Sequence, residues 1–377
     1  MEEKSMQGNG EESFAQCGGH SSANLGTLVL EAIRMWEELQ GAKGVSSQEL
    51  SKVAELIAKA MRSSPTVQDR ALCYSLLANN KNLLKSYYFE ISENNAQQQK
   101  DCLHNGEEIS CSKASQILDT LRINGIAVWD GLFLDDNIID EATELGKALY
   151  DEHIEVGYKF TSADAHKIQA PSQIWSQKGK YHFTGEPDNT QGRYRAHFPA
   201  NGKQTENQIV NSLFFNPHIR SIVKRYYQAP VREEYFLFET LTPAVENQKF
   251  HFDGLTDQMK VMVLLEDVSI DDGPLIFLKK TCNASEKLYP HFEAWFHQAE
   301  DHPDTDLDAL KNEGVEQRIV TGKKGDCIFF DTLSLHRGSP CTTGIRRNVV
   351  LTFSSETLRT QAIRPLIRQG IPQELLK

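Results

Sequence analysis

The chain has 377 residues and a formal net charge of −12 at pH 7, with 39% hydrophobic and 24% charged residues. This composition is typical of a soluble globular protein, and no apolar run reaches the length that crosses a bilayer. The acidic excess argues against nucleic acid as the main partner, because surfaces that bind it concentrate Lys and Arg.

Cysteine usage and the chain ends indicate the compartment. Seven cysteines, odd in number and without CxxC spacing, predict free thiols in a reducing environment. Residues 1–4 are acidic and lead into Gly, Ser and Gln, so we expect no signal or transit peptide. Residues 374–377 lack the Ser-Lys-Leu peroxisomal sequence. The expected location is the cytoplasm.

The first part of the chain predicts a tail, a helical region and a linker. Residues 1–23 are rich in Gly, Ser, Gln and Glu, which predicts a disordered tail. Over residues 24–91 apolar side chains recur every three to four positions, which predicts an all-helical region with Ser46 or Ser47 as one N-cap. The polar segment 92–110 predicts a linker.

Residues 111–377 are expected to form one larger domain. It opens with a helix, an Asn-Gly stop, a strand and a further helix. Residues 157–208 are Gln-, Gly- and Pro-rich and predict a long loop of the kind that is a functional lid or disordered. A helix over 211–227 and a helical insertion over 286–308 are also expected. The remaining elements are short strands, over 232–241, 249–252, 261–265, 275–278, 317–321, 327–331 and 347–353. The predicted fold is α+β, with a double-stranded β-helix core, a cupin-like jelly roll, and flanking helices.

The stretch from Gln248 to Gly254 contains a possible half of a metal site. On a strand, residues two apart share a face, so His251 and Asp253 point one way while Phe250 and Phe252 point the other. A mononuclear iron(II) of the 2-His-1-carboxylate type needs a third, distant ligand and leaves positions open for other molecules. His336, after an apolar strand, can be that ligand.

Further segments make the pattern more specific. An acidic Gly-Pro turn enters a strand at 271–278, and Arg347 follows His336 by eleven residues at the start of another strand. Together these segments resemble the phytanoyl-CoA dioxygenase family of iron(II)- and 2-oxoglutarate-dependent oxygenases, over roughly residues 114–358. The resemblance implies Fe(II), 2-oxoglutarate and O2 as cofactors, with His251, Asp253 and His336 as metal ligands and catalytic residues.

The same resemblance assigns the far carboxylate of 2-oxoglutarate to an arginine. A guanidinium fork suits a carboxylate better than a lysine does, and Arg347 stands at the spacing that the family uses. Arg346 would face the opposite side of the strand, so only one of the two can have this role. Ser339 either adds a hydroxyl to this carboxylate or forms the turn before Pro340.

The segment 157–208 also carries cations beside aromatic residues. Arg193, Arg195 and His197 alternate with Tyr194 and Phe198, a pattern that suits a small anionic substrate. The other interpretation is a solvated strand whose aromatic side chains pack on the core. We expect a small-molecule substrate, and the oligomeric state is left open.

Two other functions compete with an oxygenase. A cupin-like metal-dependent hydrolase or isomerase would use the two histidines and the acid but would have no need of Arg347. A non-catalytic binding protein on the same fold would treat His251 and Asp253 as ordinary strand residues. The residue spacing favours an oxygenase that hydroxylates, desaturates or cyclises its substrate.

Overall fold

The structure is a computed structural model of the whole chain. It describes residues 25–355 apart from 41–44, 63–66, 103–111, 135–136, 158–172, 176–181, 185–191, 200–207, 228–230, 245–247, 254–257, 283–284 and 298–302. The predicted tail, 1–23, lies outside the described residues. Within the described residues, no helix is long and apolar enough to cross a membrane.

The N-terminal region is helical, as predicted. Its helices are α1 (Leu25–Gln40), α2 (Ser47–Arg62), α3 (Val67–Ala78) and α4 (Lys81–Cys102). Ser46 is the N-cap of α2, because its Oγ accepts from the Glu49 N–H at 3.3 Å while the Glu49 carboxylate accepts from the Ser46 N–H at 2.9 Å. The prediction of a linker from residue 92 is wrong at its start, because α4 continues to Cys102, and residues 103–110 lie outside the described residues.

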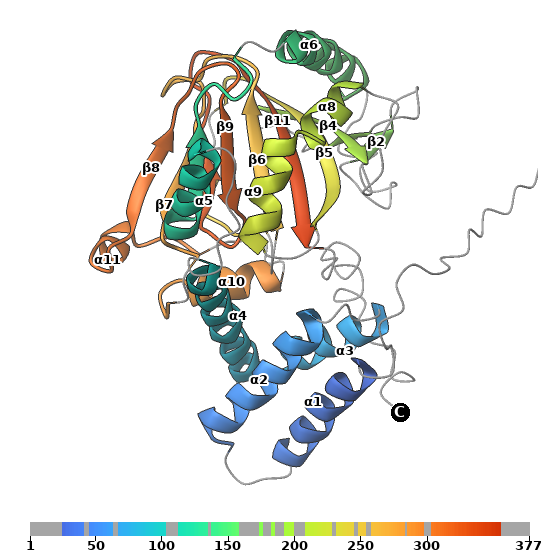
Figure 1. The fold of residues 1–377 in the computed structure, drawn as a ribbon, viewed down its shortest axis with the longest axis vertical. Helices are drawn as coiled ribbons and strands as arrows, with labels where there is room; N and C mark the ends of the chain where they lie inside the picture. The colour runs from blue at the N-terminus through green and yellow to red at the C-terminus, as the bar shows by residue number, and fades with distance from the viewer. Residues whose placement is uncertain are drawn as a thin grey trace, which may run out of the picture.

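Two antiparallel sheets form the rest of the described core. The larger one has eight strands, in the order β1 (Ile126–Trp129), β9 (Cys327–Asp331), β6 (Gln258–Leu264), β11 (Arg346–Ser355), β5 (Val231–Leu241), β4 (Arg193–Pro199), β3 (His182–Thr184) and β2 (Gln173–Trp175). The smaller one has three, in the order β10 (His336–Gly338), β7 (Leu275–Lys279) and β8 (Glu316–Val320). From β6 onward the chain passes repeatedly between the two sheets (Figure 1).

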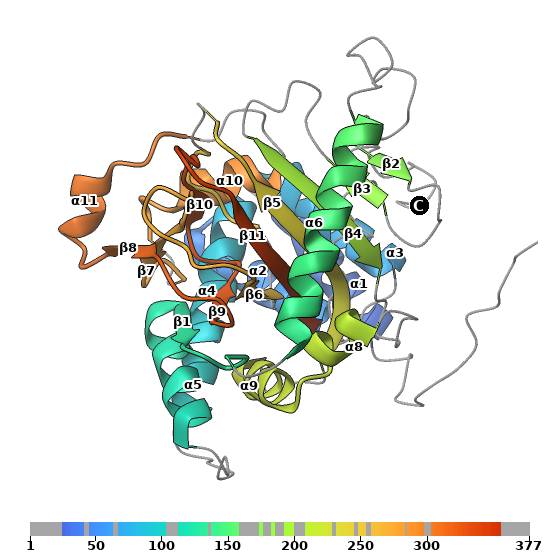
Figure 2. The same ribbon diagram turned by 90° about the horizontal axis from the view of Figure 1, so that it is seen from above.

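Side chains along each strand of the larger sheet alternate between an inner face, toward the smaller sheet, and an outer face. Outward residues such as Val261 and Leu351 join a core with the helices α5 (Ser112–Asn124), α6 (Asn137–Gly157), α8 (Gln208–Phe214) and α9 (Pro217–Tyr227). Figure 2 shows α6 lying across β5 and β11. Inward residues such as Met262 and Val350 form a second core with Phe277 of the smaller sheet. The space between the sheets is therefore apolar in this part.

Two sequence predictions about strands need correction. Residues 157–208 are not one long loop, because β2, β3 and β4 form within them and extend the larger sheet. The segment 249–252 is not a regular strand, because its pairing is limited to an isolated antiparallel bridge between His251 and His336. Side-chain alternation still holds there, since His251 is partly exposed while Phe250 and Phe252 are buried.

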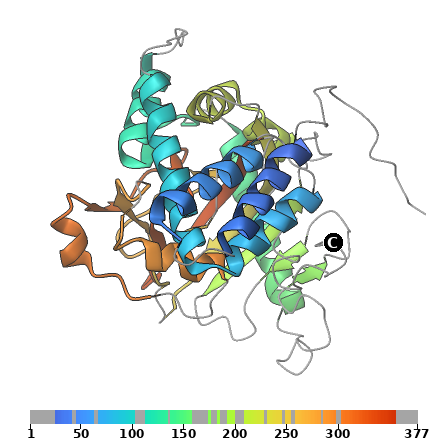
Figure 3. The ribbon, with the colours of Figure 1, turned by 90° about the horizontal axis from the view of Figure 1, so that it is seen from below.

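The helical region contacts the two-sheet part through the predicted insertion, which contains α10 (Tyr289–Phe296) and α11 (Leu307–Lys311). Tyr88 of α4 lies with its ring 4.7 Å from that of Phe292, and its hydroxyl accepts from the Ser285 N–H at 3.3 Å. Figure 3 shows α1 to α4 covering this end of the molecule. Phe250 and Phe252 belong to the same apolar core as these helices. The helical region thus completes the core behind the segment that carries His251 and Asp253.

Candidate metal centre

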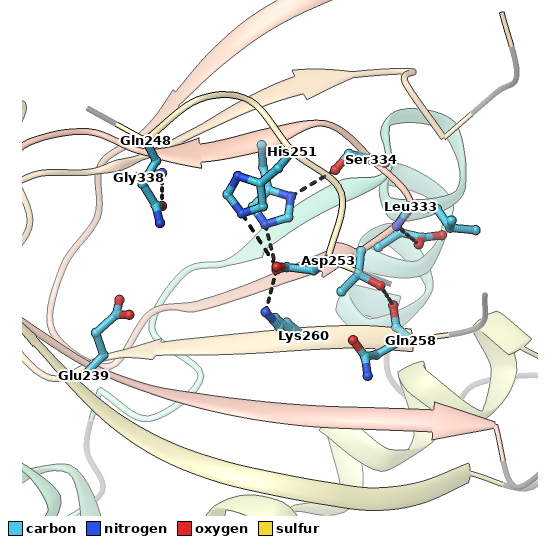
Figure 4. Close-up of polar contacts among 12 residues, drawn as sticks. Glu239, Gln248, His251, Asp253, Gln258, Lys260, Leu333, Ser334 and Gly338 are labelled. Carbon is cyan, nitrogen blue, oxygen red and sulfur yellow. Dashed lines mark hydrogen bonds and ion pairs between the residues drawn. The ribbon is translucent and has the colours of Figure 1, made fainter. Parts of the chain in front are cut away.

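The structure brings His251, Asp253 and His336 together, as the prediction requires. One ligand atom of each lies within 4.8 Å of the others, and no other such group of ligands occurs in the described part of the chain (Figure 4). The backbones of the two histidines exchange hydrogen bonds, from the His251 N–H to the His336 carbonyl at 3.0 Å and back at 3.2 Å. This bridge holds two side chains from distant parts of the sequence at one point.

Backbone carbonyls set the orientation of both imidazoles. His251 Nδ1 lies 2.8 Å from the Lys249 carbonyl and His336 Nδ1 lies 2.9 Å from the Ser334 carbonyl. Because a carbonyl can only accept, each Nδ1 carries the proton and each Nε2 keeps its lone pair. The Asp253 carboxylate lies 2.8 Å from Nε2 of His336 and 3.6 Å from Nε2 of His251. Lone pairs that converge in this way suit a shared cation, and the donor set fits iron(II).

The protonation states also suit a metal. Burial alone would raise the pKa of the Asp253 carboxyl, but Lys260 and His336 hold that pKa well below its usual range. Burial lowers the pKa of His336, although Asp253 opposes this shift. An ionised carboxylate and a neutral imidazole are the forms that bind metal ions.

Lys260 is a neighbour of the three ligand residues that the sequence interpretation missed. It projects from β6 toward the space between the sheets, and its Nζ lies 2.5 Å from Oδ2 of Asp253. It is the one charged residue in a strand that otherwise consists of apolar residues and Gln258. A lone lysine in an apolar strand is a signal that the sequence contains, because burying its charge requires a partner.

The turn that leads to His336 is held by buried polar contacts. The Asp331 carboxylate accepts from the Leu333 N–H at 2.9 Å and from the Tyr226 hydroxyl at 2.6 Å. The Thr332 hydroxyl donates to the Gln258 carbonyl at 2.8 Å. These contacts fix the backbone that ends at the metal ligand, which is how the surroundings of a metal site keep its ligands in place.

Arg346 and Arg347 point to opposite faces of β11, and Arg346 shares a face with Lys260. The register pairs Lys260 with Thr352, so residues 346, 348, 350 and 352 of β11 point between the sheets. Arg346 is 2% exposed there. The face of the metal ligands therefore carries Arg346.

Arg347 lies on the outer face. Its Nη1 is 2.7 Å from Oε1 of Glu266, and its guanidinium is 5.9 Å from the ring centre of Tyr150 on α6. The structure therefore does not place Arg347 between the sheets, where its predicted contact with the far carboxylate of 2-oxoglutarate would require it. An irregular turn separates His336 from β11, so the number of residues between them does not determine which side chain points inward. The pairing of β11 with β5 and β6 determines it.

Arg346 belongs to a buried charge cluster around Glu239 of β5. Its Nη2 lies 3.0 Å from Oε1 of Glu239, and its Nη1 donates to the Gly273 carbonyl. Arg195 Nε lies 2.8 Å and Arg193 Nε 3.5 Å from Oε2 of the same carboxylate. Burial alone would raise the pKa of Glu239, but the three guanidiniums hold it well below its usual range. The sequence interpretation also missed Glu239, the acid after the apolar residues 235–238 of β5.

The structure places the predicted substrate residues on this same face. Arg193, Arg195 and His197 alternate along β4, and the contact of Arg195 with Glu239 shows that they point inward. Arg193 reaches toward β10, because a Cβ built on Gly338 would lie 2.7 Å from its Nη2. Gly338 stands two residues after His336, so the guanidinium of Arg193 lies near the metal centre. Their roles in substrate binding stay predictions.

Ser339 is held through its backbone. Its N–H donates to the Pro274 carbonyl at 3.0 Å, which fixes the turn after β10. A contact of its hydroxyl with the cosubstrate stays a prediction.

Two antiparallel sheets that share an apolar core, with a 2-His-1-carboxylate cluster beside it, fit the class of mononuclear non-haem iron proteins. The family model for phytanoyl-CoA dioxygenase (PhyH) matches residues 122–349, more than half of the chain. The chain therefore belongs to the phytanoyl-CoA dioxygenase family, whose members use Fe(II), 2-oxoglutarate and O2. No curated protein matches the sequence.

Several solved structures are similar to this chain. One is the epimerase SnoN in complex with Fe3+, alpha ketoglutarate and nogalamycin RO, with 14% identity, a TM-score of 0.45 and coverage of 69% of this chain and 90% of that chain. Another is EctD from S. alaskensis with bound Fe, with 13% identity, a TM-score of 0.44 and coverage of 68% and 82%. HygX from Streptomyces hygroscopicus, with nickel, 2-oxoglutarate and hygromycin B bound, has 13% identity, a TM-score of 0.38 and coverage of 64% and 87%.

Proposed function

We propose that this protein is an Fe(II)- and 2-oxoglutarate-dependent oxygenase that acts on an unactivated C–H bond of a small anionic metabolite. One observation carries the proposal. The cluster of His251, Asp253 and His336 shares the space between the sheets with a buried arginine, Arg346, whose face the strand register fixes. A metal hydrolase or isomerase would need the metal cluster but would not need the buried arginine.

The proposal includes the fold. The eight-stranded and three-stranded sheets are interpreted as the two halves of a double-stranded β-helix, because the chain crosses between them after β6, β8, β9 and β10 and a shared apolar core lies inside. The metal ligands come from β10 and from the segment before β6, so they lie at one end of this core. The helices α5, α6, α8 and α9 cover the outer face of the larger sheet and contribute no ligand.

Arg346 is the proposed partner of the far carboxylate of 2-oxoglutarate. Its Nε is buried and has no hydrogen-bond partner among the described residues, so the guanidinium still has a donor to offer. Burial lowers the pKa of Arg346, and Glu239 opposes this shift, so the side chain stays a cation. A charge-assisted pair in such a site is strong, because water competes weakly there.

The protein residues hold and orient the reactants. When bound, iron and 2-oxoglutarate supply the oxidising power, since dioxygen converts 2-oxoglutarate to succinate and carbon dioxide. His251, Asp253 and His336 would hold the metal, and Lys260 keeps one oxygen of Asp253 occupied. With three protein ligands, such a metal would have room for the cosubstrate and dioxygen as well.

Arg195 is the proposed contact for the anionic group of the substrate. Its side chain is 36% exposed, whereas that of Arg346 is 2% exposed, although both contact Glu239. The deeper guanidinium suits a cosubstrate that binds first, and the more exposed one suits a substrate that arrives later. Arg193 and His197, on the same strand face, are proposed to line this outer part.

An anaerobic titration tests the oxygenase proposal. Addition of Fe(II) and then 2-oxoglutarate should give the weak visible charge-transfer band of the chelate, and air should then give succinate. Arg346→Ala should lose the band at 2-oxoglutarate concentrations that saturate the wild type. A wild-type protein that binds no Fe(II), or binds Fe(II) and gives neither band nor succinate, would leave the hydrolase or the binding protein as the better function.

The substrate role of β4 has its own test. Arg195→Ala should raise the KM of the substrate and leave uncoupled 2-oxoglutarate turnover intact, because the substitution removes a contact away from the metal. Arg193→Ala provides a comparison on the same face. Unchanged kinetics in both variants would return this strand to a purely structural role.

A further inference from the structure

Asn348 is a buried amide in an unexpected environment. It lies in β11, is 0% exposed, and neither its Nδ2 nor its Oδ1 has a hydrogen-bond partner among the described residues. An amide buried in this way costs free energy unless something pairs with it, and native proteins pair nearly all such groups. Asn348 therefore needs a partner that the surrounding side chains do not provide.

The strand register shows where this amide points. Asn348 pairs with Leu264 of β6 on one side and with Glu239 of β5 on the other, and it follows Arg346 by two residues, so both face inward. Leu264 belongs to the apolar core between the sheets and offers no polar atom. The Nε–H of Arg346, also buried and unpaired, comes from the same strand face.

Asn348 also lies between Arg346 and the metal end of the strand. The next inward residues of β11 are Val350 and Thr352, and Thr352 pairs with Lys260, which contacts Asp253. A molecule that extends from the metal toward Arg346 therefore passes Val350 and then meets the side-chain donors of Asn348 and Arg346 on β11. A carboxylate accepts several hydrogen bonds at once, so one guanidinium does not exhaust it.

We propose that Asn348 is a second anchor for the far carboxylate of 2-oxoglutarate, with Nδ2 donating to one carboxylate oxygen while Arg346 binds the other. This inference rests on the proposed function. It makes Asn348 a binding residue that selects a 2-oxo acid with a second carboxylate over one that ends in a methyl group.

The test compares two 2-oxo acids that chelate a metal in the same way. Fe(II)-loaded protein is titrated anaerobically with 2-oxoglutarate and with pyruvate, which lacks the far carboxylate, and the chelate band is followed. Asn348→Leu keeps the volume and removes both amide atoms. We expect 2-oxoglutarate to bind about 10- to 100-fold more weakly, the range for loss of a hydrogen bond to a charged group. The affinity for pyruvate should stay within about twofold of the wild-type value. Pyruvate has only the end that chelates the metal, and Asn348 is proposed to contact the other end.

Two further variants sharpen the comparison. Asn348→Asp puts a carboxylate beside that of the cosubstrate, so it should weaken 2-oxoglutarate binding more than Asn348→Leu does and again spare pyruvate. Thr352→Val is the matched control, because the Thr352 hydroxyl is also buried and unpaired on the same strand face. It should leave the ratio of the two dissociation constants unchanged.

The stability of Asn348→Leu separates this role from a structural one. If a ligand is the partner, the variant unfolds at the same or a higher temperature, because it removes unpaired buried atoms. Unchanged 2-oxoglutarate binding would overturn the inference, with a lower Tm pointing instead to a partner such as Glu239 or a buried water. Equal weakening of both acids would also overturn it. Failure of the proposed function looks different, because the wild type itself would then give no chelate band.

Discussion

The inner and outer faces of the larger sheet are built by the same strands but carry different chemistry. Inward positions of β4, β5, β6 and β11 hold Arg195, Glu239, Lys260 and Arg346, while outward positions mostly pack against helices. Arg346 and Arg347 show the contrast between adjacent residues, since one meets Glu239 and the other meets Glu266. The difference teaches that changes to the outer face should affect stability, whereas changes to the inner face should affect ligand binding.

The largest expected effect comes from removing the helical region behind the metal ligands. A protein that starts at residue 112 exposes the apolar core that Phe250 and Phe252 share with α1 to α4, so it should aggregate on expression. A protein that starts at residue 24 should behave like the full chain. Size-exclusion chromatography of both makes the comparison, and a soluble, active protein from residue 112 would show that the helical region is an independent module.

Loss of a metal ligand should come next. His336→Ala and His251→Ala should each abolish Fe(II)-dependent turnover, because two ligands remain of the three that a facial site needs. The fold should persist, since the bridge between these two residues uses backbone atoms. Circular dichroism and metal titration check both points. Undiminished activity in either variant would contradict the metal assignment.

The paired arginines give the most direct test of the two faces. Arg346→Ala should weaken 2-oxoglutarate binding on the order of 100-fold, or about 3 kcal/mol, because a buried charge pair loses its cation. Arg347→Ala should leave that affinity within about twofold and lower stability by about 1 kcal/mol, through lost contacts with Glu266 and Tyr150. Titration of the chelate band and thermal unfolding measure both. The reverse pattern would mean that β11 is shifted by one residue.

The last expected effect is a pH dependence on the outer face. Burial lowers the pKa of His153 to about 4, and its ring packs 5.2 Å from that of Tyr194. In the unfolded chain the pKa of His153 is about 6.5. The unfolded state therefore binds more protons than the folded state between about pH 4 and pH 6.5. The contribution of His153 to stability is complete above about pH 6.5 and is lost as the pH falls toward 4. The contribution is at most about 3 kcal/mol. In His153→Phe, unfolding by denaturant should depend less on pH across this window, with Fe(II) binding at pH 7 unchanged.

The metal cluster could be predicted from the sequence because alternation along a strand is a local property. His251 and Asp253 share a face whatever the strand pairs with, and a distant histidine after an apolar strand, His336, completes the set. The choice between Arg346 and Arg347 could not be made in this way. It depends on pairing with β5 and β6, and a turn of irregular geometry precedes both residues.

Some of the predicted element boundaries were wrong, for a different physical reason. α4 runs past residue 92 because its polar residues, mainly Gln, Asn, Lys and Glu, include no Gly or Pro to stop a helix. β2 and β3 are three residues each, too short to show a hydrophobic period. They form because β3 pairs with β4 and β2 pairs with β3, and the local sequence does not show this pairing. Lys260 was visible as the single charge in β6 and Glu239 as the acid after the apolar residues 235–238, but their partner side chains come from other segments.

The backbone bridge between His251 and His336 has a consequence for hydrogen exchange. Each of these two amide protons is held by the carbonyl of the other ligand residue, and together they close the loop formed by residues 252–335. A metal that joins the two side chains would add a third link across this closure, so local opening would have to break all three. Deuterium uptake at these two amides should therefore slow when metal binds, and would report metal occupancy without any chromophore.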